Sequence, residues 1–313
     1  MRVLFAGSPA IAVPALERVF SLSKNVCEIA GVLTNPDMPK GRGGKFDVTD
    51  VGKVAVQLGV PVLKLEKLDA SAREAVRALC PDILVSFAYG RIFGPKFLAL
   101  FPLGGINIHP SLLPKYRGPS PIQAAILNME AETGISIQRL DLEMDSGDIL
   151  LQEKLPLIGR ETTVGLNESI AQKAADLLEK ALAGIATGSI TGTPQNSADA
   201  TFCRTLTKED GFIDWTMSAQ AIDACVRAFN PWPLAWTRHT GARLFILEAH
   251  WMETGAVGTP GGILCADKQN GILVQTGKGV LAITKLQLET KKALDWQSFL
   301  NGARNFLGTR FEI

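Results

Sequence analysis

Short apolar runs alternate with helical patterns through the first two hundred residues, and this alternation restricts the possible fold more than any other feature of the sequence. The run Val3 to Ala6 is apolar throughout, and the run Ile83 to Phe87 is apolar except for Ser86, which is typical of strands buried on both faces. Between such runs lie helical patterns, including Asp50 to Leu58 and Ala70 to Leu79. This order predicts an α/β domain with a Rossmann-like, doubly wound parallel sheet.

The last hundred or so residues have a different rhythm. After one expected helix, Ala219 to Phe229, short strands separated by Gly-rich turns predict a small β-barrel. A stretch rich in Gly, Thr, Ser and Pro, GSITGTPQNSADAT, ends at Thr201 and suggests a connection between domains. We therefore expect one domain over residues 1–205 and a second over residues 206–313.

Composition narrows the class of protein. The chain of 313 residues is 46% hydrophobic and 20% charged, so it can bury one large or two medium cores. Its net charge of +1 argues against nucleic-acid binding by bulk electrostatics. Its five cysteines include no C-x-x-C pair, which indicates reduced and mostly buried thiols. No apolar run reaches about 18 residues, so we expect a soluble, cytoplasmic protein that binds no membrane.

Two stretches carry most of the functional information: INIHPSLLPKYRG from Ile106, and SIQRLDLEMDSGDIL from Ser136. Asn107 and His109 are two residues apart on an expected strand, so their side chains point to the same face. Pro110 then disfavours helix, and the strand should end in an irregular loop. Open α/β sheets bind their ligands at the carboxyl ends of such strands.

The order of these motifs resembles the family of 10-formyltetrahydrofolate-dependent formyltransferases, whose pattern is Asn-x-His, Ser-Leu-Leu-Pro, Arg-Gly and a later D-x-G-D. Further similarity lies in FAGSPAIAVPALERV, PIQAAIL, ETGISI, EDGFIDW and RAFNPWPLAW, so the resemblance covers nearly the whole chain. It implies that Asn107, His109 and Asp145 are catalytic, that 10-formyltetrahydrofolate is the co-substrate, and that no metal is needed. The similarity is greatest to the branch whose acceptor is methionine on initiator tRNA, in which an OB-like C-terminal domain helps to hold the tRNA.

These residue types suit formyl transfer to an amine, which needs a neutral amine, a stabilised oxyanion and a protonated leaving nitrogen. The amide of Asn107 can donate to the oxyanion, and a cationic His109 can add charge there. Asp145, if close to His109, would raise its pKa and could also accept a proton from the attacking ammonium. Gly7-Ser8-Pro9 after the first strand lacks G-x-G-x-x-G, so no nicotinamide cofactor is indicated.

By position in the resemblance, the folate site lies beside these three residues. Its expected members come from the end of one strand, from the loop after His109 and from the start of the acidic turn: Tyr89, Gly90, Arg91, Ile92, Ser111, Leu112, Leu113, Pro114, Leu140 and Asp141. Pterin recognition commonly uses backbone donors and acceptors, so residue identity constrains this site less than the catalytic one.

Two basic patches are candidates for tRNA contact. The loop DMPKGRGGKFD carries Lys40, Arg42 and Lys45, and the resemblance implies that it reaches the acceptor end of the tRNA. A flexible solvated loop is the alternative. Lys278 and Lys285 belong to a weaker patch, for which an ordinary solvated face is nearly as good an interpretation.

Other functions remain open on the sequence. A formyltransferase that acts on a nucleotide-linked amino sugar shares the catalytic motif and can also carry a small C-terminal barrel. An RNA-binding protein that has lost the chemistry is a third hypothesis, which the presence of all three acid, base and amide residues disfavours. We expect a monomer that binds folate and methionyl initiator tRNA.

Overall fold

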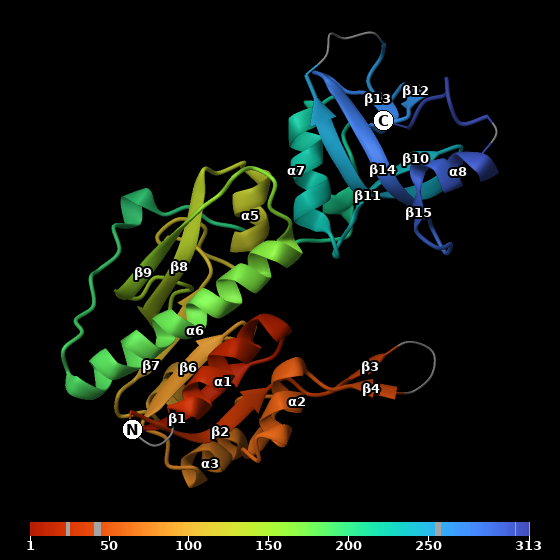
Figure 1. The fold of residues 1–313 in the computed structure, drawn as a ribbon. Helices are drawn as coiled ribbons and strands as arrows, with labels where there is room; N and C mark the ends of the chain where they lie inside the picture. The colour runs from red at the N-terminus through yellow and green to blue at the C-terminus, as the bar shows by residue number, and fades with distance from the viewer. Residues whose placement is uncertain (23–25, 41–44, 254–257, 304, 313) are drawn as a thin grey trace. The chain divides into compact units, whose positions relative to one another are not determined.

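The computed structural model describes residues 1–22, 26–40, 45–253, 258–303 and 305–312 (Figure 1). The chain forms two compact units. Unit 1 consists of Met1–Pro121, Glu132–Pro156 and Asn167–Cys203, and unit 2 of Ile122–Ala131, Leu157–Leu166 and Arg204–Ile313. The domain boundary expected near residue 206 stays a prediction, because unit 2 also contains two earlier segments. Among the described residues, no helix combines the length and apolar character that crossing a membrane requires.

Unit 1 is built on a seven-stranded sheet with the order β5-β2-β1-β6-β7-β8-β9. The strands are β1 (Arg2–Gly7), β2 (Glu28–Thr34), β5 (Val62–Lys64), β6 (Ile83–Phe87), β7 (Gly105–His109), β8 (Glu132–Arg139) and β9 (Ile149–Pro156). Pairing is parallel from β5 to β7, whereas β8 is antiparallel to both of its neighbours. The α/β sheet is therefore confirmed, but it is mixed and not wholly parallel. The turn between β8 and β9 is too short for the crossover that a parallel pair needs.

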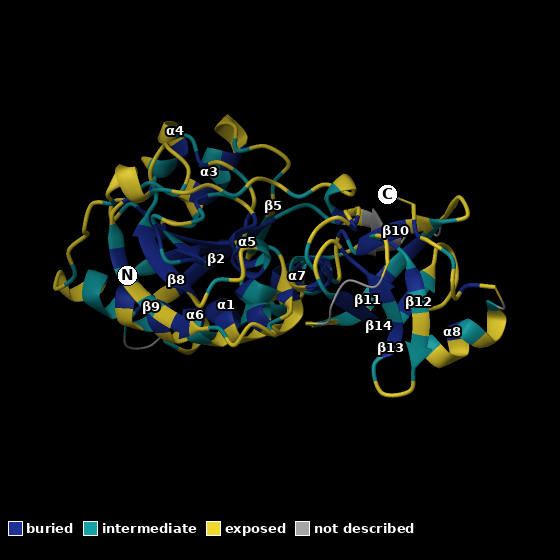
Figure 2. Cartoon of the chain, turned by 90° about the horizontal axis from the view of Figure 1, so that it is seen from above, coloured by how far each residue is buried: buried dark blue, intermediate teal, exposed yellow. Residues whose placement is uncertain are grey.

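Helices cover both faces of this sheet. The helices of unit 1 are η1 (Ala10–Ala12), α1 (Val13–Ser21), α2 (Asp50–Gln57), α3 (Ala70–Ala78), α4 (Pro95–Leu98) and most of α6 (Thr163–Thr187). Helix α5 (Pro121–Leu127) belongs to unit 2 except for its first residue. In Figure 2 the helices α1 and α6 lie on one face, and α3 and α4 on the other. Val76 of α3 and Phe97 of α4 pack with Leu4, Leu33 and Leu84 of the strands in one buried cluster. The two-sided burial explains the long apolar runs in the central strands β1 and β6.

A short hairpin, not expected from the sequence, contains two of the basic tRNA candidates. Strands β3 (Met38–Lys40) and β4 (Lys45–Asp47) are antiparallel, with Lys40 opposite Lys45 in the register. Arg42, the third candidate, lies outside the described residues.

Unit 2 contains an antiparallel sheet of order β10-β11-β14-β13-β12, with β15 paired to β14. Its elements are η4 (Glu209–Gly211), α7 (Ala219–Phe229), β10 (Ala235–His239), β11 (Ala242–Met252), β12 (Ile263–Asp267), β13 (Gly271–Gln275), β14 (Val280–Leu288), β15 (Leu294–Asp295) and α8 (Trp296–Gly302). The buried Trp215 stacks on Phe311 at a ring separation of 4.9 Å and donates from Nε1 to Thr237. Among the described strands, β10 and β12 end the sheet unpaired with each other, so the closed barrel stays a prediction.

The cysteines differ partly from expectation. All five thiols are free, but only Cys27 is buried, whereas Cys80 and Cys265 are exposed. The prediction of mostly buried thiols is therefore wrong for those two. Cys80 has a positive φ of 46° just after α3, a position set by the helix end and not by packing.

Candidate active site

Strand β7 places the amide and the imidazole on one face of the sheet. Asn107 lies opposite Gln138 of the antiparallel strand β8, and His109 lies opposite Ser136. Residues directly opposite in an antiparallel pair share a face, so these four polar side chains gather there. Ile106 and Ile108, which alternate with them on β7, are buried in the core. The Asn-x-His spacing therefore places both side chains on one face of the strand, as strand alternation predicts.

The turn after β8 returns the chain so that Asp145 faces this polar cluster. Asp145 adopts a left-handed backbone with a φ of 54°. A Cβ atom on Gly147 would lie 2.0 Å from the carbonyl oxygen of Arg139, so only glycine permits the approach. The amide of Arg139 donates to the carbonyl of Asp148 at 2.8 Å, which closes the turn. These contacts explain why the motif has glycine two residues after the aspartate.

The carboxylate of Asp145 contacts both of the other catalytic candidates. Its Oδ1 accepts from Nδ2 of Asn107 at 3.3 Å and from Nε2 of Gln138 at 2.9 Å. Its Oδ2 accepts from the backbone N–H of Gly118 at 2.9 Å and lies 3.5 Å from Nδ1 of His109. The side chain of Asp145 is 12% exposed, so the structure brings the three predicted residues together in a mostly dehydrated cluster.

The Arg-Gly of the first motif has a structural explanation. Gly118 has a φ of 122°, and a Cβ atom there would lie 2.1 Å from the carbonyl oxygen of Cys203. The backbone of Arg117 pairs with this later segment, since its amide donates to Thr201 and its carbonyl accepts from Cys203. The close approach requires glycine, and it leaves the Gly118 amide free to donate to Asp145.

The imidazole of His109 is 4% exposed and lies between two acceptors. Its Nε2 is 2.9 Å from the carbonyl oxygen of Tyr116, and a carbonyl can only accept, so Nε2 carries a proton. Burial lowers the pKa of His109 below its ordinary value, although the charge of Asp145 and the hydrogen bond to Tyr116 act in the opposite direction. Asp145 raises the pKa of His109 as expected, but burial lowers it by more, so the expectation of a cationic His109 is wrong.

The loop after His109 is fixed by side chains of the neighbouring strands. Ser136 accepts from the amide of Leu113 at 3.0 Å and donates to the carbonyl of Ser111 at 2.6 Å. Gln152 of β9 donates to the carbonyl of Leu113. Ser111 and Leu113 are themselves buried, and Leu112 packs over Gly134. These contacts hold four of the expected folate residues in a rigid loop: Ser111, Leu112, Leu113 and Pro114.

The other folate candidates occupy the ends of β6 and β8. Tyr89 is buried, and its hydroxyl has no hydrogen-bond partner among the described residues. The guanidinium of Arg91 donates to the carbonyls of Leu65 and Glu66, and Gly90 has a left-handed φ of 78°. Ile92, in contrast, is 77% exposed.

The acidic turn completes this region. Leu140 packs against Gly105, and Asp141 accepts from the amide of Leu142. Leu142 and Met144 are exposed on the same turn, at 61% and 59%. Both lie in the turn from Arg139 to Asp145, which the family resemblance includes in the folate site, but the sequence did not single them out.

The basic residues of unit 2 differ in their surroundings. Lys278 is exposed, whereas Nζ of Lys285 lies 2.9 Å from a carboxylate oxygen of Glu248. Part of the positive charge expected in this patch is therefore already paired.

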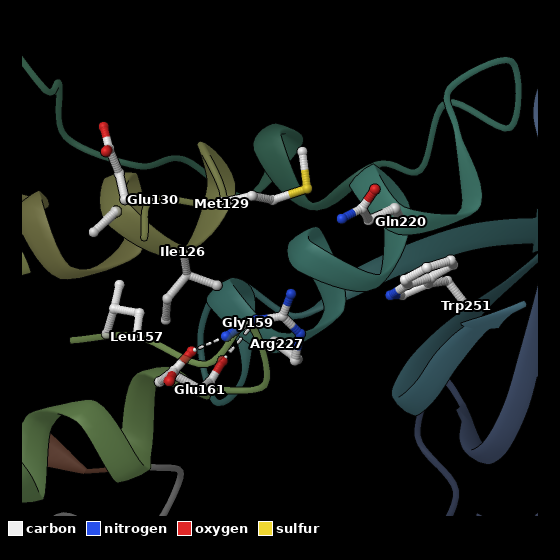
Figure 3. A pocket seen from close by; sticks show the side chains of 10 residues that line it. Ile126, Met129, Glu130, Leu157, Gly159, Glu161, Gln220, Arg227 and Trp251 are labelled. Atoms are coloured by element: carbon white, nitrogen blue, oxygen red, sulfur yellow. Dashed lines mark hydrogen bonds between the residues drawn. The ribbon is translucent and has the colours of Figure 1, made fainter. Parts of the chain in front are cut away.

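Unit 2 also contains a small cavity, shown in Figure 3, that includes none of the catalytic candidates. Its volume is about 100 Å³, and Ile126, Met129, Arg227 and Trp251 contribute to its lining. Arg227 is held by Asp223 at 2.8 Å and by the carbonyl of Glu161. In the part of the chain that the structure describes, no group of three or more His, Cys, Asp or Glu side chains could hold a metal ion.

Two further residues of the catalytic cluster were not singled out from the sequence. Gln138 could have been found, because Ser136 and Gln138 are polar residues that alternate with the apolar Ile135 and Ile137 on the same strand. Gln195, whose Nε2 donates to the carbonyls of Asp145 and Gly147, lies in the polar stretch interpreted as a connection. Its sequence neighbourhood gives no signal of this role.

Comparison with known proteins is consistent with this site. Residues 1–182 match the formyl transferase family, and residues 205–304 match the formyl transferase C-terminal domain. The chain is 45% identical to methionyl-tRNA formyltransferase of Treponema denticola, with 100% of both chains covered. It is 44% identical to the enzyme of that name from Roseiflexus sp., over 99% of this chain and 95% of the other.

Solved structures show a related fold at lower identity. HypX from Aquifex aeolicus in complex with tetrahydrofolic acid is 18% identical with a TM-score of 0.67, over 98% of this chain. The match spans about half of HypX, 48% of its length. WlaRD, a sugar 3N-formyl transferase, is 20% identical with a TM-score of 0.66, over 93% of this chain and 99% of the other. The family matches and full-length relatives establish that this chain belongs to the formyl transferase family.

Proposed function

We propose that this protein transfers the formyl group of 10-formyltetrahydrofolate to the amino group of methionine on initiator tRNA. The observation that carries the proposal is the cluster of Asn107, His109 and Asp145, in a chain that is 45% identical over its full length to a methionyl-tRNA formyltransferase. Formyl transfer to an amine is acyl transfer, which needs an oxyanion donor and a route for one proton.

Asn107 supplies the oxyanion donor. One N–H of its amide is directed to Asp145, which fixes the orientation of the side chain and leaves the second N–H for the formyl oxygen. As the amine attacks the formyl carbon, that oxygen gains negative charge, and a donor already in place stabilises the charge without rearrangement. Asn107 is half-buried on β7, so its amide is accessible from the carboxyl end of the strand.

His109 and Asp145 provide the route for the proton. With Nε2 protonated toward Tyr116, a neutral His109 has its free lone pair on Nδ1, beside Asp145. The pair can therefore accept the proton that the attacking nitrogen loses, and the resulting imidazolium lies next to a carboxylate. The proton then returns to the leaving nitrogen as the carbon–nitrogen bond breaks. Each proton taken up is thus given back within one turnover.

The residues around this cluster fit a folate. The exposed apolar side chains of Ile92, Leu142 and Met144 suit its aromatic portion, and the buried hydroxyl of Tyr89 has no hydrogen-bond partner among the described residues. The loop from Ser111 to Pro114 is held rigidly, which lets backbone groups serve as donors and acceptors. When bound, 10-formyltetrahydrofolate supplies the activated formyl group.

We assign contact with the acceptor end of the tRNA to the basic segment that contains Lys40, Arg42 and Lys45, and further contact with its phosphates to Lys278 and Lys285. We assign the antiparallel sheet of unit 2 to an OB-like barrel that supports this contact. We propose that the protein functions as a monomer in the cytoplasm.

Tetrahydrofolate release from 10-formyltetrahydrofolate tests the proposal. The purified protein is given methionyl initiator tRNA, uncharged initiator tRNA or a nucleotide-linked amino sugar as acceptor. Release with the charged tRNA alone, together with formylmethionine recovered from that tRNA, is the expected result. Release with the amino sugar alone would contradict the acceptor but retain the catalytic residues, and no release with any acceptor would refute the reaction.

A further inference from the structure

The side chain of Gln195 links the stretch that follows α6 to the turn that carries Asp145. Its Nε2 lies 2.9 Å from the carbonyl oxygen of Asp145, 2.7 Å from that of Gly147, and 3.2 Å from Oε1 of Gln138. One side-chain amide therefore holds two carbonyls of the catalytic turn and the side chain of a neighbouring strand. None of the contacts that position Asp145 along its own turn has this reach.

Arg117 determines which way the Gln195 amide faces. Its Nε and one terminal nitrogen both donate to Oε1 of Gln195, at 3.1 Å and 2.8 Å. A guanidinium has no acceptor, so only the oxygen end of the amide can face it. Arg117 is 6% exposed, which excludes most water from competition for this contact. The nitrogen end of Gln195 must then point toward the catalytic turn.

The same argument determines the orientation of the Gln138 side-chain amide. Because Gln195 presents a nitrogen, the oxygen of Gln138 faces it, and the nitrogen of Gln138 faces Oδ1 of Asp145. Gln138 is 1% exposed, so a flipped amide would place two oxygens against each other without water between them. The orientation set at Arg117 thus passes through two amides to the carboxylate.

We propose that Arg117, Gln195 and Gln138 form an orientation chain that positions Asp145, and through it Asn107 and His109, for formyl transfer. The inference rests on the proposed function for its kinetic part only. The three are positioning residues, since the chain reaches the reacting atoms through Asp145 and none of the three contacts His109 in the described structure. Displacement of Asp145 by about 1 Å is enough to lower turnover about 100-fold.

Substitutions at Gln195 test the chain with little risk to folding, because this side chain is half-buried. Gln195→Met keeps the length and removes every donor and acceptor. Gln195→Glu keeps an acceptor for Arg117 but removes the donors. Gln57→Met, an exposed position on α2, is the matched control.

Two readouts are needed for these variants. The first is kcat and KM for formyl transfer. The second is the ¹⁵N–¹H signal pair of the Gln138 side-chain amide in labelled protein, identified by its disappearance in Gln138→Met. The amide signals require no substrate, so they report on the chain even if the wild-type protein formylates no tRNA.

We expect both Gln195 variants to lower kcat by about 10- to 100-fold with KM for folate within about two-fold of wild type. We also expect the Gln138 signals to shift or broaden in both variants and to stay unchanged in Gln57→Met. The Glu variant keeps the contact with Arg117, but its second carboxylate oxygen would face the carbonyls of Asp145 and Gly147, so we expect its Tm to fall. Unchanged Gln138 signals in Gln195→Met would overturn the chain, and so would an unchanged kcat with shifted signals. A wild-type protein inactive with charged tRNA would overturn the proposed function instead.

Discussion

Nε2 of His109 lies 2.9 Å from the carbonyl oxygen of Tyr116, seven residues later in the chain. Because this carbonyl holds the ring proton on Nε2, the nitrogen that faces Asp145 is the one that gains and loses a proton. Tyr116 has a left-handed φ of 59°, the backbone conformation that turns its carbonyl toward the ring. A backbone group therefore sets the tautomer of the catalytic base.

Replacement of His109 by alanine removes both the proton acceptor and the cation that forms beside the oxyanion. We expect kcat to fall about 1,000-fold, with the Kd for tRNA within about two-fold of wild type. Single-turnover formylation and a tRNA-binding assay measure the two quantities. His250→Ala, on β11 in unit 2, is the control and should keep full activity. An active His109→Ala enzyme would refute the site.

Gly147→Ala tests the backbone of the catalytic turn. The new Cβ would lie 2.0 Å from the Arg139 carbonyl, so the turn must move and Asp145 with it. We expect kcat to fall by about 100-fold and Tm to fall by several degrees. Gly302→Ala, where a Cβ meets no atom within 4 Å, should change neither. Wild-type turnover in Gly147→Ala would show that the position of the turn does not matter.

The lowered pKa of His109 predicts how stability depends on pH. The folded protein binds this proton less readily than the unfolded chain, whose histidine titrates near 6.5. The free energy of unfolding should therefore be unaffected by His109 above that pH and fall as the pH drops below it, by up to about 1.4 kcal/mol per pH unit. Urea unfolding between pH 8 and pH 5 measures the slope.

The control for this slope is His109→Gln, which should flatten it. His239 also has a pKa lowered by burial, against the opposing charge of Glu312, so part of the slope will remain in that variant. A slope equally steep in wild type and His109→Gln would show that His109 does not contribute the predicted pH dependence.

Arg42→Ala tests the basic segment that contains Lys40, Arg42 and Lys45. Loss of a phosphate or base contact should raise KM for charged tRNA about 10-fold or more while the KM for folate stays constant. Initial rates at varied tRNA concentration measure this effect. Lys180→Ala, an exposed cation of α6, should leave both constants unchanged. A dependence on tRNA concentration like that of wild type would exclude this segment from the interface.

The two lysines of unit 2 should contribute unequally. Lys285 is paired with Glu248, so its charge is partly neutralised, whereas Lys278 is exposed. We expect Lys278→Ala to weaken tRNA binding more than Lys285→Ala, and to reduce the slope of log Kd against log salt by nearly one. Binding titrations at several salt concentrations compare the variants. Equal losses would indicate that Glu248 releases Lys285 on binding.

Much of the fold follows from the sequence because the pattern of apolar residues depends on local geometry. The expected strand Ile83 to Phe87 and helix Ala219 to Phe229 have the observed bounds, and other elements differ by a few residues at their ends. Helix α8 and the β3–β4 hairpin were missed, since short amphipathic segments leave little periodic signal. The antiparallel direction of β8 depends on tertiary pairing, which no local pattern encodes.

The catalytic site was predictable in part for the same reason. Asn107 and His109 follow from strand alternation, and their convergence with Asp145 followed from the family resemblance. Gln195 could not be predicted, because its role arises from contacts with Asp145 fifty residues earlier and with Arg117. The net direction of the His109 pKa depends on burial, which is a property of the folded state and not of a motif.

The contact between Gln195 and the catalytic turn also has a consequence for the order of synthesis. A chain emerging from the ribosome contains Asn107, His109 and Asp145 once its first 145 residues are made, but the amide that holds their turn follows 50 residues later. A nascent chain, or a fragment cut after residue 182 where the family match ends, would possess all three reactive side chains without that support. Under the proposed orientation chain, catalytic competence is acquired late, when the stretch that follows α6 docks beside the turn.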